Sequence, residues 1–358
     1  MRKYRNGIGL LGYLVGVISS TVVQADETAE QTRIVSVERI WDRAEHSAFT
    51  DLIRFEGDLY CTFREGSGHV PGQNGVIRVI RSRDDMNWQS VALLAEPHVD
   101  LRDPKLSVTP DGRLMLNTGA SYYHGSERKR IESRVFFRDH ETGRFGEPHR
   151  VVLPETITTG FDWLWRVTWH DNWVWGCVQQ VPPGKPRSLQ LVRSRDGIRY
   201  EHVATLDVDF PSETTLRFLP DATMLAMIRR GGKKPAGWIG QANPPYTKWQ
   251  FQASNQSFGG PNLISLPDGN WLAGSRGYGG RTATELWQLD LKTSQFQHLV
   301  TLPSGGDTSY PGFVINEQEN RLLVSYYSSH EGKAAIYLAT LRLDALTNSQ
   351  AVTDNVAR

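Results

Sequence analysis

The sequence predicts an all-β fold, a six-bladed β-propeller built of four-stranded antiparallel blades. The 358-residue chain contains 11 Trp, 12 Tyr, 13 Phe and 33 Gly, a mixture that suits strands joined by tight turns. One strand–turn–strand unit recurs six times, with starts 48 to 62 residues apart. This interval is close to the period of a propeller blade, and further strand candidates between the hairpins supply the other two strands.

Each repeated unit contains a first strand, a two-residue turn and a second apolar strand. The first strands are expected to start at Asp51, Asp103, Trp165, Glu213, Pro261 and Tyr310. The turn pairs are Glu56-Gly57, Asp111-Gly112, Asp171-Asn172, Asp221-Ala222, Asp268-Gly269 and Glu319-Asn320. Acid-Gly and acid-Asn pairs suit the positive φ of tight hairpin turns. Ala222 fits that chemistry less well, so we expect another turn type there.

The segment 33–41 is left over at the N-terminal side and could complete the last blade. Such pairing closes the ring and removes the exposed edges of an open sheet. A twelve-stranded β-sandwich and two separate β-domains are the alternatives. Equal spacing without a linker favours the propeller.

The N-terminus has the pattern of a secretory signal. Arg2, Lys3 and Arg5 precede an apolar stretch over residues 8–23, and Val23-Gln24-Ala25 offers small residues for cleavage. An uncleaved membrane anchor is the alternative, disfavoured by a short apolar run rich in glycine. We therefore expect a signal peptide over 1–25, a catalytic propeller over 33–345 and a C-terminal tail over 346–358. The mature chain is then a secreted or periplasmic monomer that is not bound to a membrane.

The charge bears on possible binding partners, and the two cysteines bear on disulfide formation and metal binding. The net charge is +1 without long charged runs, which argues against nucleic acid as a partner. Cys61 and Cys177 fall on second strands of blades that are not neighbours, so we expect two separate buried thiols. Neither cysteine lies in a CxxC or His-rich context, so neither is expected to bind metal.

The ends of the hairpins are the place to look for function. A hairpin returns its chain to the end where it began, and the first strands of a propeller line its axis. Six sequence-distant strand starts should therefore meet the ends of the second strands at one rim. Counted seven residues beyond each turn, these ends are Arg64, Gly119, Gln179, Arg229, Arg276 and Tyr327. Three arginines in one register favour an anionic ligand, although pairing with Asp51, Asp103 and Glu213 would leave them purely structural.

Several of these segments resemble the sialidase (neuraminidase) superfamily of six-bladed propellers over roughly residues 40–345. The segments SRDDMNW at 82–88 and SRDGIRY at 194–200 are similar to its Asp-box repeats of the form SxDxGxxW. The hairpin from Glu213 to Arg229 resembles the family's Glu-then-Arg hairpin. GSRGYGG around Arg276 resembles a carboxylate-binding arginine segment, and Tyr310 resembles the family's nucleophile.

The resemblance implies an exo-glycoside hydrolase that removes a terminal acidic sugar with retention of configuration. Tyr310 would attack and Glu213 would accept its proton, because a neutral nucleophile is not repelled by the substrate carboxylate. Asp103 is the first candidate for the general acid and Asp51 the second. The expected substrate contacts are Arg64, Arg229 and Arg276 to the carboxylate, Arg166 as a further anion contact, Trp165 stacked on a sugar ring, and His69. Core packing is the equally weighted alternative for Trp165.

Two departures from the family pattern predict a divergent active site. Ala48-Phe49-Thr50 stands where the family carries Arg-Ile-Pro, and the loop 66–75, where the acid normally lies, offers only His69. Two alternatives therefore stay open. One is a propeller polysaccharide lyase or another glycosidase acting on a uronic-acid glycan, with His69 or His330 as acid or base. The other is a non-catalytic carbohydrate-binding propeller. The expected partner in each case is an acidic carbohydrate, and the scheme requires no metal or other cofactor.

Overall fold

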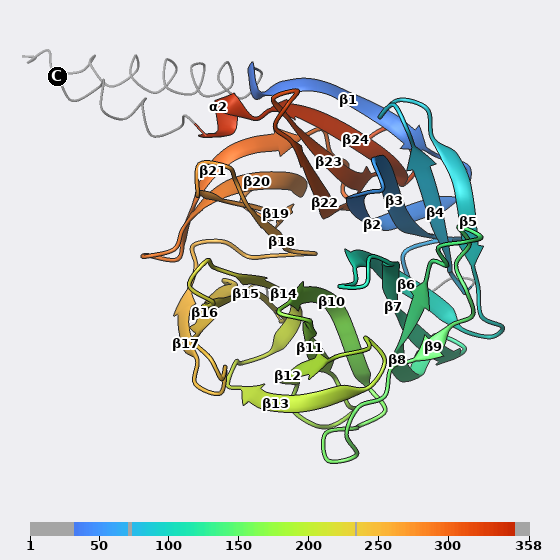
Figure 1. Cartoon of the computed structure of the whole chain (residues 1–358), viewed down its shortest axis with the longest axis vertical. Helices are drawn as coiled ribbons and strands as arrows, with labels where there is room; N and C mark the ends of the chain where they lie inside the picture. The colour runs from blue at the N-terminus through green and yellow to red at the C-terminus, as the bar shows by residue number, and fades with distance from the viewer. Residues whose placement is uncertain (1–31, 71–73, 233–234, 348–358) are drawn as a thin grey trace, which may run out of the picture.

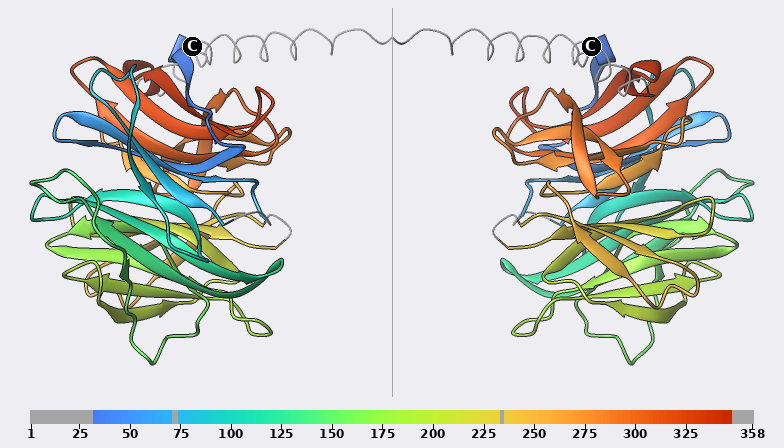
Figure 2. Two further views of the ribbon diagram at one scale, coloured as in Figure 1. Left: turned by 90° about the vertical axis from the view of Figure 1, so that its right-hand side faces the viewer. Right: turned by 90° about the vertical axis from the view of Figure 1, so that its left-hand side faces the viewer.

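The computed structural model describes residues 32–70, 74–232 and 235–347, which form six four-stranded antiparallel sheets around a central axis (Figure 1). The predicted six-bladed propeller is confirmed. The side views of Figure 2 show the strands running across the thickness of the ring, so that the loops gather on two opposite faces. Within these ranges, no helix is both long and apolar enough to span a membrane. The predicted signal peptide and residues 348–358 of the predicted tail lie outside the described residues.

Each blade consists of four strands that are consecutive in the chain, except that β1 joins the last blade. Blades 1 and 2 contain β2 (His46–Phe55), β3 (Asp58–Gly66), β4 (Val76–Ser82) and β5 (Gln89–Leu94), then β6 (Asp100–Val108), β7 (Leu114–His124), β8 (Glu127–Phe137) and β9 (His149–Arg150). Blades 3 and 4 contain β10 (Asp162–His170), β11 (Trp173–Gln180), β12 (Ser188–Ser194) and β13 (Tyr200–Leu206), then β14 (Pro211–Phe218), β15 (Met224–Arg230), β16 (Trp238–Ala242) and β17 (Gln250–Ala253). Blades 5 and 6 contain β18 (Asn262–Ser265), β19 (Trp271–Gly277), β20 (Ala283–Asp290) and β21 (Gln295–Leu302), then β22 (Thr308–Asn316), β23 (Arg321–Ser328), β24 (Ala335–Arg342) and β1 (Ile34–Trp41).

The N-terminal strand closes the ring. β1 pairs antiparallel with β24, with Val37 opposite Ala339, so the first described strand completes the last blade as the sequence predicts. The short helix α2 (Asp344–Thr347) follows this blade, and its Leu346 is fully buried against blades 5 and 6. The closure leaves the six innermost strands β2, β6, β10, β14, β18 and β22 around the axis (Figure 1).

The core of the protein lies between neighbouring blades. The buried apolar side chains of the described residues fall into six clusters. Five of them join two adjacent blades each, and the sixth contains residues of blades 1, 2, 3 and 6. The apolar faces of the sheets thereby leave water, which supplies the main favourable free energy of folding. Cys61 on β3 and Cys177 on β11 are buried in two different clusters as free thiols, which confirms the prediction.

The hairpin turns differ from the prediction in four blades. Only blades 1 and 3 have two-residue turns, and blade 6 has a four-residue connection. Blades 2, 4 and 5 have five-residue connections over residues 109–113, 219–223 and 266–270. In these, the N–H groups of Gly112, Ala222 and Gly269 each donate to the carbonyl three residues earlier, at 2.9 to 3.0 Å. The expectation of another turn type at Ala222 is therefore wrong, because Ala222 adopts the positive φ of its glycine counterparts.

Five inner strands carry a β-bulge near their start, at equivalent places in their blades. In each bulge two residues of the inner strand face one residue of the second strand. The bulged pairs are Phe49-Thr50, Asp103-Pro104, Trp165-Arg166, Ser212-Glu213 and Tyr310-Pro311. A bulge bends the strand and redirects side chains, and positive φ in a non-glycine residue often marks a functional site. Phe49, Asp103 and Tyr310 all have positive φ, between 55° and 65°.

Candidate active site

Tyr310 and Glu213 form a short hydrogen bond at the axial end of blades 4 and 6. The Tyr310 hydroxyl donates to Glu213 Oε1 at 2.5 Å, across 97 residues of sequence. Each residue lies in the bulge of its inner strand, β22 and β14, and both are buried, at 6% and 4% exposure. The bulges thus bring a phenol and a carboxylate into direct contact, as the sequence predicts for this pair.

Glu213 is held as a carboxylate by two further groups. Arg229 Nη1 donates to both of its oxygens at 2.8 Å, and the Gly260 N–H donates to Oε2 at 2.8 Å. Burial opposes the charge, but Arg229, Tyr310 and Gly260 together hold the pKa of Glu213 below its ordinary value. Glu213 is therefore ionised at neutral pH and can polarise the phenol.

Gly260 is required next to Tyr310 for a steric reason. It has a φ of +67°, and a Cβ atom at this position would lie 2.5 Å from Cγ and Cδ2 of Tyr310. Glycine therefore permits both the left-handed backbone and the close approach of the ring. Burial, followed by the nearby Glu213 and Asp103 charges, raises the pKa of Tyr310 well above its ordinary value. Tyr310 is consequently a neutral phenol bonded to a base.

Arg229 and Arg276 border this pair and remain partly accessible. The Arg229 side chain is 27% exposed, and the Arg276 guanidinium lies 6.0 Å from the Tyr310 ring centre. Arg276 Nε donates to the Thr308 carbonyl at 2.7 Å and Nη2 to the Tyr327 hydroxyl at 2.8 Å. Two guanidiniums thus lie beside one tyrosine, which is a suitable arrangement for an anionic group.

Asp103 is the carboxyl group of this region that lacks hydrogen bonds. It is 1% exposed, and neither side-chain oxygen has a hydrogen-bond partner among the residues that the structure describes. Its nearest cation is Arg102, with Nε 3.5 Å from Oδ2. Burial raises the pKa of Asp103, against the opposing effect of Arg102 and Lys105. A carboxyl group with a raised pKa is what a general acid needs. We call Asp103, Glu213, Arg229, Arg276 and Tyr310 the axial cluster.

Arg64 does not belong to the axial cluster, so the prediction that it binds the substrate carboxylate is wrong. It is 1% exposed, donates through Nε and Nη2 to Asp100 Oδ1 at 2.9 and 2.8 Å, and donates through Nη1 to the Gly68 carbonyl. Arg64 pairs with Ala48, before the bulge, whereas Arg229 faces the bulge of its own blade. The two arginines are therefore not equivalent, because unequal turn lengths shift the count along the second strand.

Asp51 and Arg166 also differ from their predicted roles. Arg166 Nη1 donates to both Asp51 oxygens at 3.0 and 3.2 Å, the Leu106 N–H donates to Asp51 Oδ2, and both charged side chains are buried. The bulge of blade 1 contains Phe49 and Thr50, so the counterpart of Asp103 is Phe49, and Asp51 lies two residues further along. Asp51 therefore ties three blades together and is not placed to donate a proton to a substrate.

Trp165 belongs to the core beneath the axial cluster. It is 1% exposed and packs edge-on against Tyr310 with ring centres 6.1 Å apart, so it offers no face for a sugar. Lys105 Nζ lies 5.2 Å from the Trp165 ring and 5.5 Å from the Tyr310 ring. Burial, followed by the nearby Arg166, lowers the pKa of Lys105 to about 8. Of the two predicted roles of Trp165, its burial therefore supports core packing and not stacking on a sugar ring.

Phe49 occupies a central place, although the sequence singled it out only as part of the segment that stands where the family carries Arg-Ile-Pro. Its ring lies 5.0 Å from Tyr310, 5.5 Å from Tyr327 and 4.9 Å from His69, measured between ring centres. The Arg102 guanidinium lies 5.3 Å from the same ring. An aromatic side chain therefore separates the axial cluster from His69.

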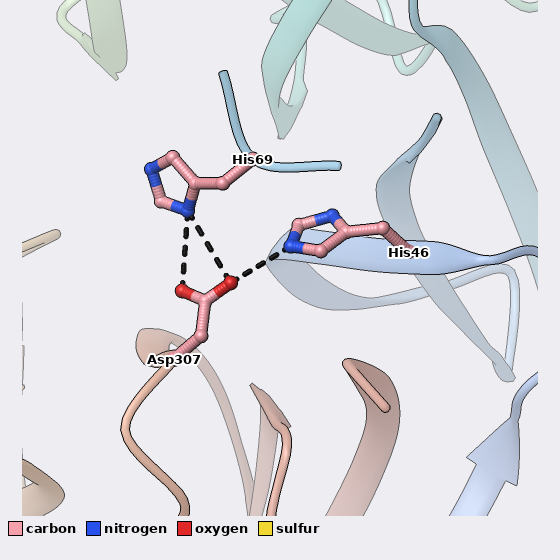
Figure 3. A group of neighbouring side chains, drawn as sticks. All are labelled: His46, His69 and Asp307. Carbon is pink, nitrogen blue, oxygen red and sulfur yellow. Dashed lines mark hydrogen bonds and ion pairs between the residues drawn. The ribbon is translucent and has the colours of Figure 1, made fainter. Parts of the chain in front are cut away.

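His69 contacts Asp307, which in turn contacts His46, and the sequence singled out neither Asp307 nor His46. Its Nδ1 lies 3.1 Å from Asp307 Oδ1, and His46 Nε2 lies 2.7 Å from Asp307 Oδ2 (Figure 3). The Tyr327 hydroxyl also donates to Asp307, at 2.9 Å.

The dipeptides Asp103-Pro104 and Tyr310-Pro311 mark two bulges in the sequence, because proline within a sheet is found at bulges. No comparable signal marks His46 or Asp307.

Three large surface cavities lie away from the axial cluster. They have volumes of about 460, 450 and 540 Å³ and are lined by residues of blade 5, of blades 2 and 3, and of blades 1, 5 and 6. The last includes Arg54, Ser265 and Asn316, which lie at the turn ends of their hairpins, opposite to the bulges. Their linings do not contain the residues of the axial cluster.

Comparisons with known proteins show the fold alone. No protein-family model matches the chain, and no curated protein does. A protein of unknown function from Dyadobacter fermentans is similar in structure, with a TM-score of 0.76 and 17% identity over 87% of this chain and 98% of that one. The sialidase of Trypanosoma rangeli has a TM-score of 0.67 and 11% identity over 91% of this chain.

The chain spans 61% of that sialidase, less than two thirds of its length. The sialidase has also been solved as a covalent intermediate with 2,3-difluorosialic acid. An α-L-arabinofuranosidase from Fusarium graminearum has a TM-score of 0.64 and 14% identity over 87% of this chain and 98% of that one. All three proteins share the architecture of this chain at low identity.

Proposed function

We propose that the protein is a sialidase-like exo-glycoside hydrolase that removes a terminal acidic sugar with retention of configuration. The observation that carries the proposal is the 2.5 Å hydrogen bond from the Tyr310 hydroxyl to Glu213, whose carboxylate is fixed by Arg229 and Gly260. The structural likeness to a sialidase and an arabinofuranosidase, both glycosidases by name, supports this reaction class.

In the first step the Tyr310 oxygen attacks the anomeric carbon of the substrate. Its proton passes to Glu213, and the bond to the leaving sugar breaks as Asp103 donates a proton to the leaving oxygen. A glycosyl–tyrosine intermediate remains. In the second step Asp103 takes a proton from water as the water attacks the same carbon. The bond between this carbon and the Tyr310 oxygen breaks, and Tyr310 recovers its proton from Glu213. Two displacements at one carbon retain its configuration.

The proposed substrate carries a carboxylate beside its anomeric carbon. A charged nucleophile would be repelled by that group, whereas a neutral phenol next to a base is not, and tyrosine is the nucleophile known for this situation. Arg229 and Arg276 provide guanidinium donors beside Tyr310. Phe49, in the segment that stands where the family carries Arg-Ile-Pro, adds an apolar contact beside Tyr310. We therefore expect an acidic sugar with a carboxylate beside its anomeric carbon, as in a sialoside. We also expect an exported, monomeric enzyme.

The proposal is tested with fluorogenic glycosides of acidic sugars, beginning with a sialoside. The wild-type chain should release the free sugar, and Tyr310→Phe should lower kcat/KM by about 10³-fold or more, because the nucleophilic oxygen is removed. Tyr326→Phe is the matched control, since Tyr326 is a buried tyrosine of the same blade whose hydroxyl donates to the Pro303 carbonyl. It should retain activity.

A trapping experiment identifies the nucleophile directly. Incubation with 2,3-difluorosialic acid followed by peptide mass spectrometry should place a glycosyl adduct on Tyr310. Full activity of Tyr310→Phe, or an adduct on another residue, would contradict the proposal. An unsaturated product absorbing in the ultraviolet would indicate a lyase, and binding of acidic glycans without turnover would indicate a carbohydrate-binding propeller.

A further inference from the structure

Three side chains with metal-ligating chemistry converge next to the axial cluster. His46 lies on β2, His69 in the loop after β3 and Asp307 directly before β22, so they come from three separate segments of blades 1 and 6 (Figure 3). One ligand atom from each residue lies within 4.8 Å of the other two. The proposed hydrolytic mechanism uses none of these three residues.

The distances are compatible with one small ion. His46 Nε2 and Asp307 Oδ2 are 2.7 Å apart, and His69 Nδ1 and Asp307 Oδ1 are 3.1 Å apart. Ligand atoms of a tetrahedral zinc site, with bonds near 2.0–2.1 Å, lie about 3.3 Å from one another. Small side-chain rotations would therefore convert the present contacts into coordination bonds, while the backbone stays in place.

The surroundings orient these ligands. The Tyr327 hydroxyl donates to Asp307 Oδ1 at 2.9 Å, and the Ser329 N–H donates to the Asp307 carbonyl at 3.0 Å. The His69 ring packs edge-on against Phe49, with ring centres 4.9 Å apart and planes at 88°. Groups that fix the direction of a ligand raise metal affinity, because less freedom is lost on binding.

The three side chains differ in exposure, so the group they form is accessible to solvent on one side. The side chain of His46 is 10% exposed, that of Asp307 30% and that of His69 44%. An ion bound here would be covered by the protein on the side of His46 and accessible to solvent on the side of His69. Three protein ligands with an open fourth position are the arrangement of a catalytic zinc site.

We propose that His46, His69 and Asp307 bind one divalent transition-metal ion, with Zn²⁺ as the best fit, and leave an open position for an oxygen ligand. Two imidazoles and one carboxylate favour zinc over calcium or magnesium, which prefer sites made of oxygen atoms. Tyr327 connects this three-residue site to the axial cluster, because its hydroxyl donates to Asp307 and accepts from Arg276. A carboxylate or hydroxyl oxygen of a ligand held at Arg276 is the class of group that the open position would take.

The site is tested by metal binding to the full chain after removal of any affinity tag and dialysis against a chelator. Equilibrium dialysis with Zn²⁺ should give one ion per chain, and Co²⁺ should give the visible absorption of a low-symmetry, four- or five-coordinate site. His69→Ala should weaken Zn²⁺ binding at least about 100-fold, because a direct ligand is lost. Since His69 is the most exposed ligand, this variant should fold normally.

His124→Ala is the matched control, since His124 is an exposed histidine at the end of β7 and lies outside the three-residue group. It should bind Zn²⁺ like the wild type. Absence of stoichiometric Zn²⁺ binding by the wild type, or equal binding by His69→Ala, would show that the three residues form only an ion-paired network. The readout is binding, so its outcome is independent of glycosidase activity.

Discussion

The charged side chains near the axis differ in exposure between the two halves of the ring. In blades 1 to 3, Arg64 is paired with Asp100 and Arg166 with Asp51, and all four side chains are almost fully buried. In blades 4 to 6, Glu213 is equally buried, but its partner Arg229 is 27% exposed. Partnered and covered cations hold blades together, whereas partly accessible cations beside a polarised phenol can receive a ligand. Arg64 and Arg229 also differ in position, because Arg64 pairs before the bulge of its blade whereas Arg229 faces the bulge.

The difference originates in the segments that cover the strand ends. The Asp100 carboxylate at the start of β6 receives Arg64, and the Gly75 N–H donates to the same oxygen at 2.6 Å. A Cβ atom on Gly66 or Gly75 would lie within 2.7 Å of the Arg64 side chain, so both segments lie directly on it. On the other side of the ring, Gly260 donates its backbone N–H to Glu213, and Arg229 remains partly accessible.

The comparison predicts its largest effect at Arg64. Arg64→Met should lower the free energy of unfolding by about 3–5 kcal/mol, because Asp100 would remain buried without its main counter-ion. Arg276→Met strands no buried ion and removes hydrogen bonds to a carbonyl and a hydroxyl, so its loss should stay below about 2 kcal/mol. Urea unfolding of both variants and the wild type measures these values.

The effects of the same two substitutions on KM should have the opposite order to their effects on stability. Arg276→Met should raise KM for an acidic sugar at least about 10-fold, since a charge-assisted contact is lost. Arg64→Met should leave the KM of the folded fraction near that of the wild type. A larger stability loss for Arg276→Met than for Arg64→Met would contradict the division between the two halves.

The fold was predictable because its signals are local and repeated. Hairpin patterns at regular intervals predict six blades, and the surplus segment 33–41 predicts the closing strand. The Tyr310–Glu213 pair was predictable because both residues lie near the starts of inner strands. Turn length was not, since the same acid-Gly pair occurs in a two-residue turn at Gly57 and in a five-residue connection at Gly112. That uncertainty shifted the register and misplaced Arg64 and Asp51.

The contacts of His46 and Asp307 could not be predicted from the sequence for a different reason. These residues are 261 positions apart and meet only because blade 6 lies beside blade 1 in the closed ring. Hydrophobic patterning specifies which strands form and carries no information on which loop side chains touch. Covering loops also decide whether a buried charge such as Asp103 receives a partner, and no short sequence pattern encodes this.

Asp103 gives a prediction of intermediate size, because it is the member of the axial cluster that lies in blade 2. Asp103→Asn should lower kcat about 100-fold, since the proposed general acid is removed. The variant also tests the protonation of Asp103. Its pKa is raised by burial in the folded chain, so the folded state binds more protons than the unfolded state between the ordinary value of about 4 and the raised value.

The stability that Asp103 contributes is therefore complete at low pH and is lost as pH rises through that window. The difference in unfolding free energy, wild type minus Asp103→Asn, should fall as pH increases above about 4, because asparagine does not titrate. Urea unfolding of both proteins across this range measures it. Glu213, with a lowered pKa, has the opposite sign and loses its contribution as pH falls. A difference that rises with pH would show that Asp103 is instead held as a carboxylate.

The smallest effect is expected at the far end of blade 4, where the turn is independent of the axial cluster. Ala222 has a φ of +64° at the position that glycine occupies in blades 2 and 5. The left-handed conformation costs alanine about 1–2 kcal/mol, and glycine loses about 0.4–1 kcal/mol more chain entropy on folding. Ala222→Gly should therefore stabilise the protein by about 0.5–1 kcal/mol. Gly269→Ala, where a Cβ atom would meet no atom of the described residues within 4 Å, should destabilise it by a similar amount. Thermal unfolding measures both changes, and both variants should keep wild-type kcat and KM, because the turn lies at the opposite end of the hairpin from the bulge that presents Glu213.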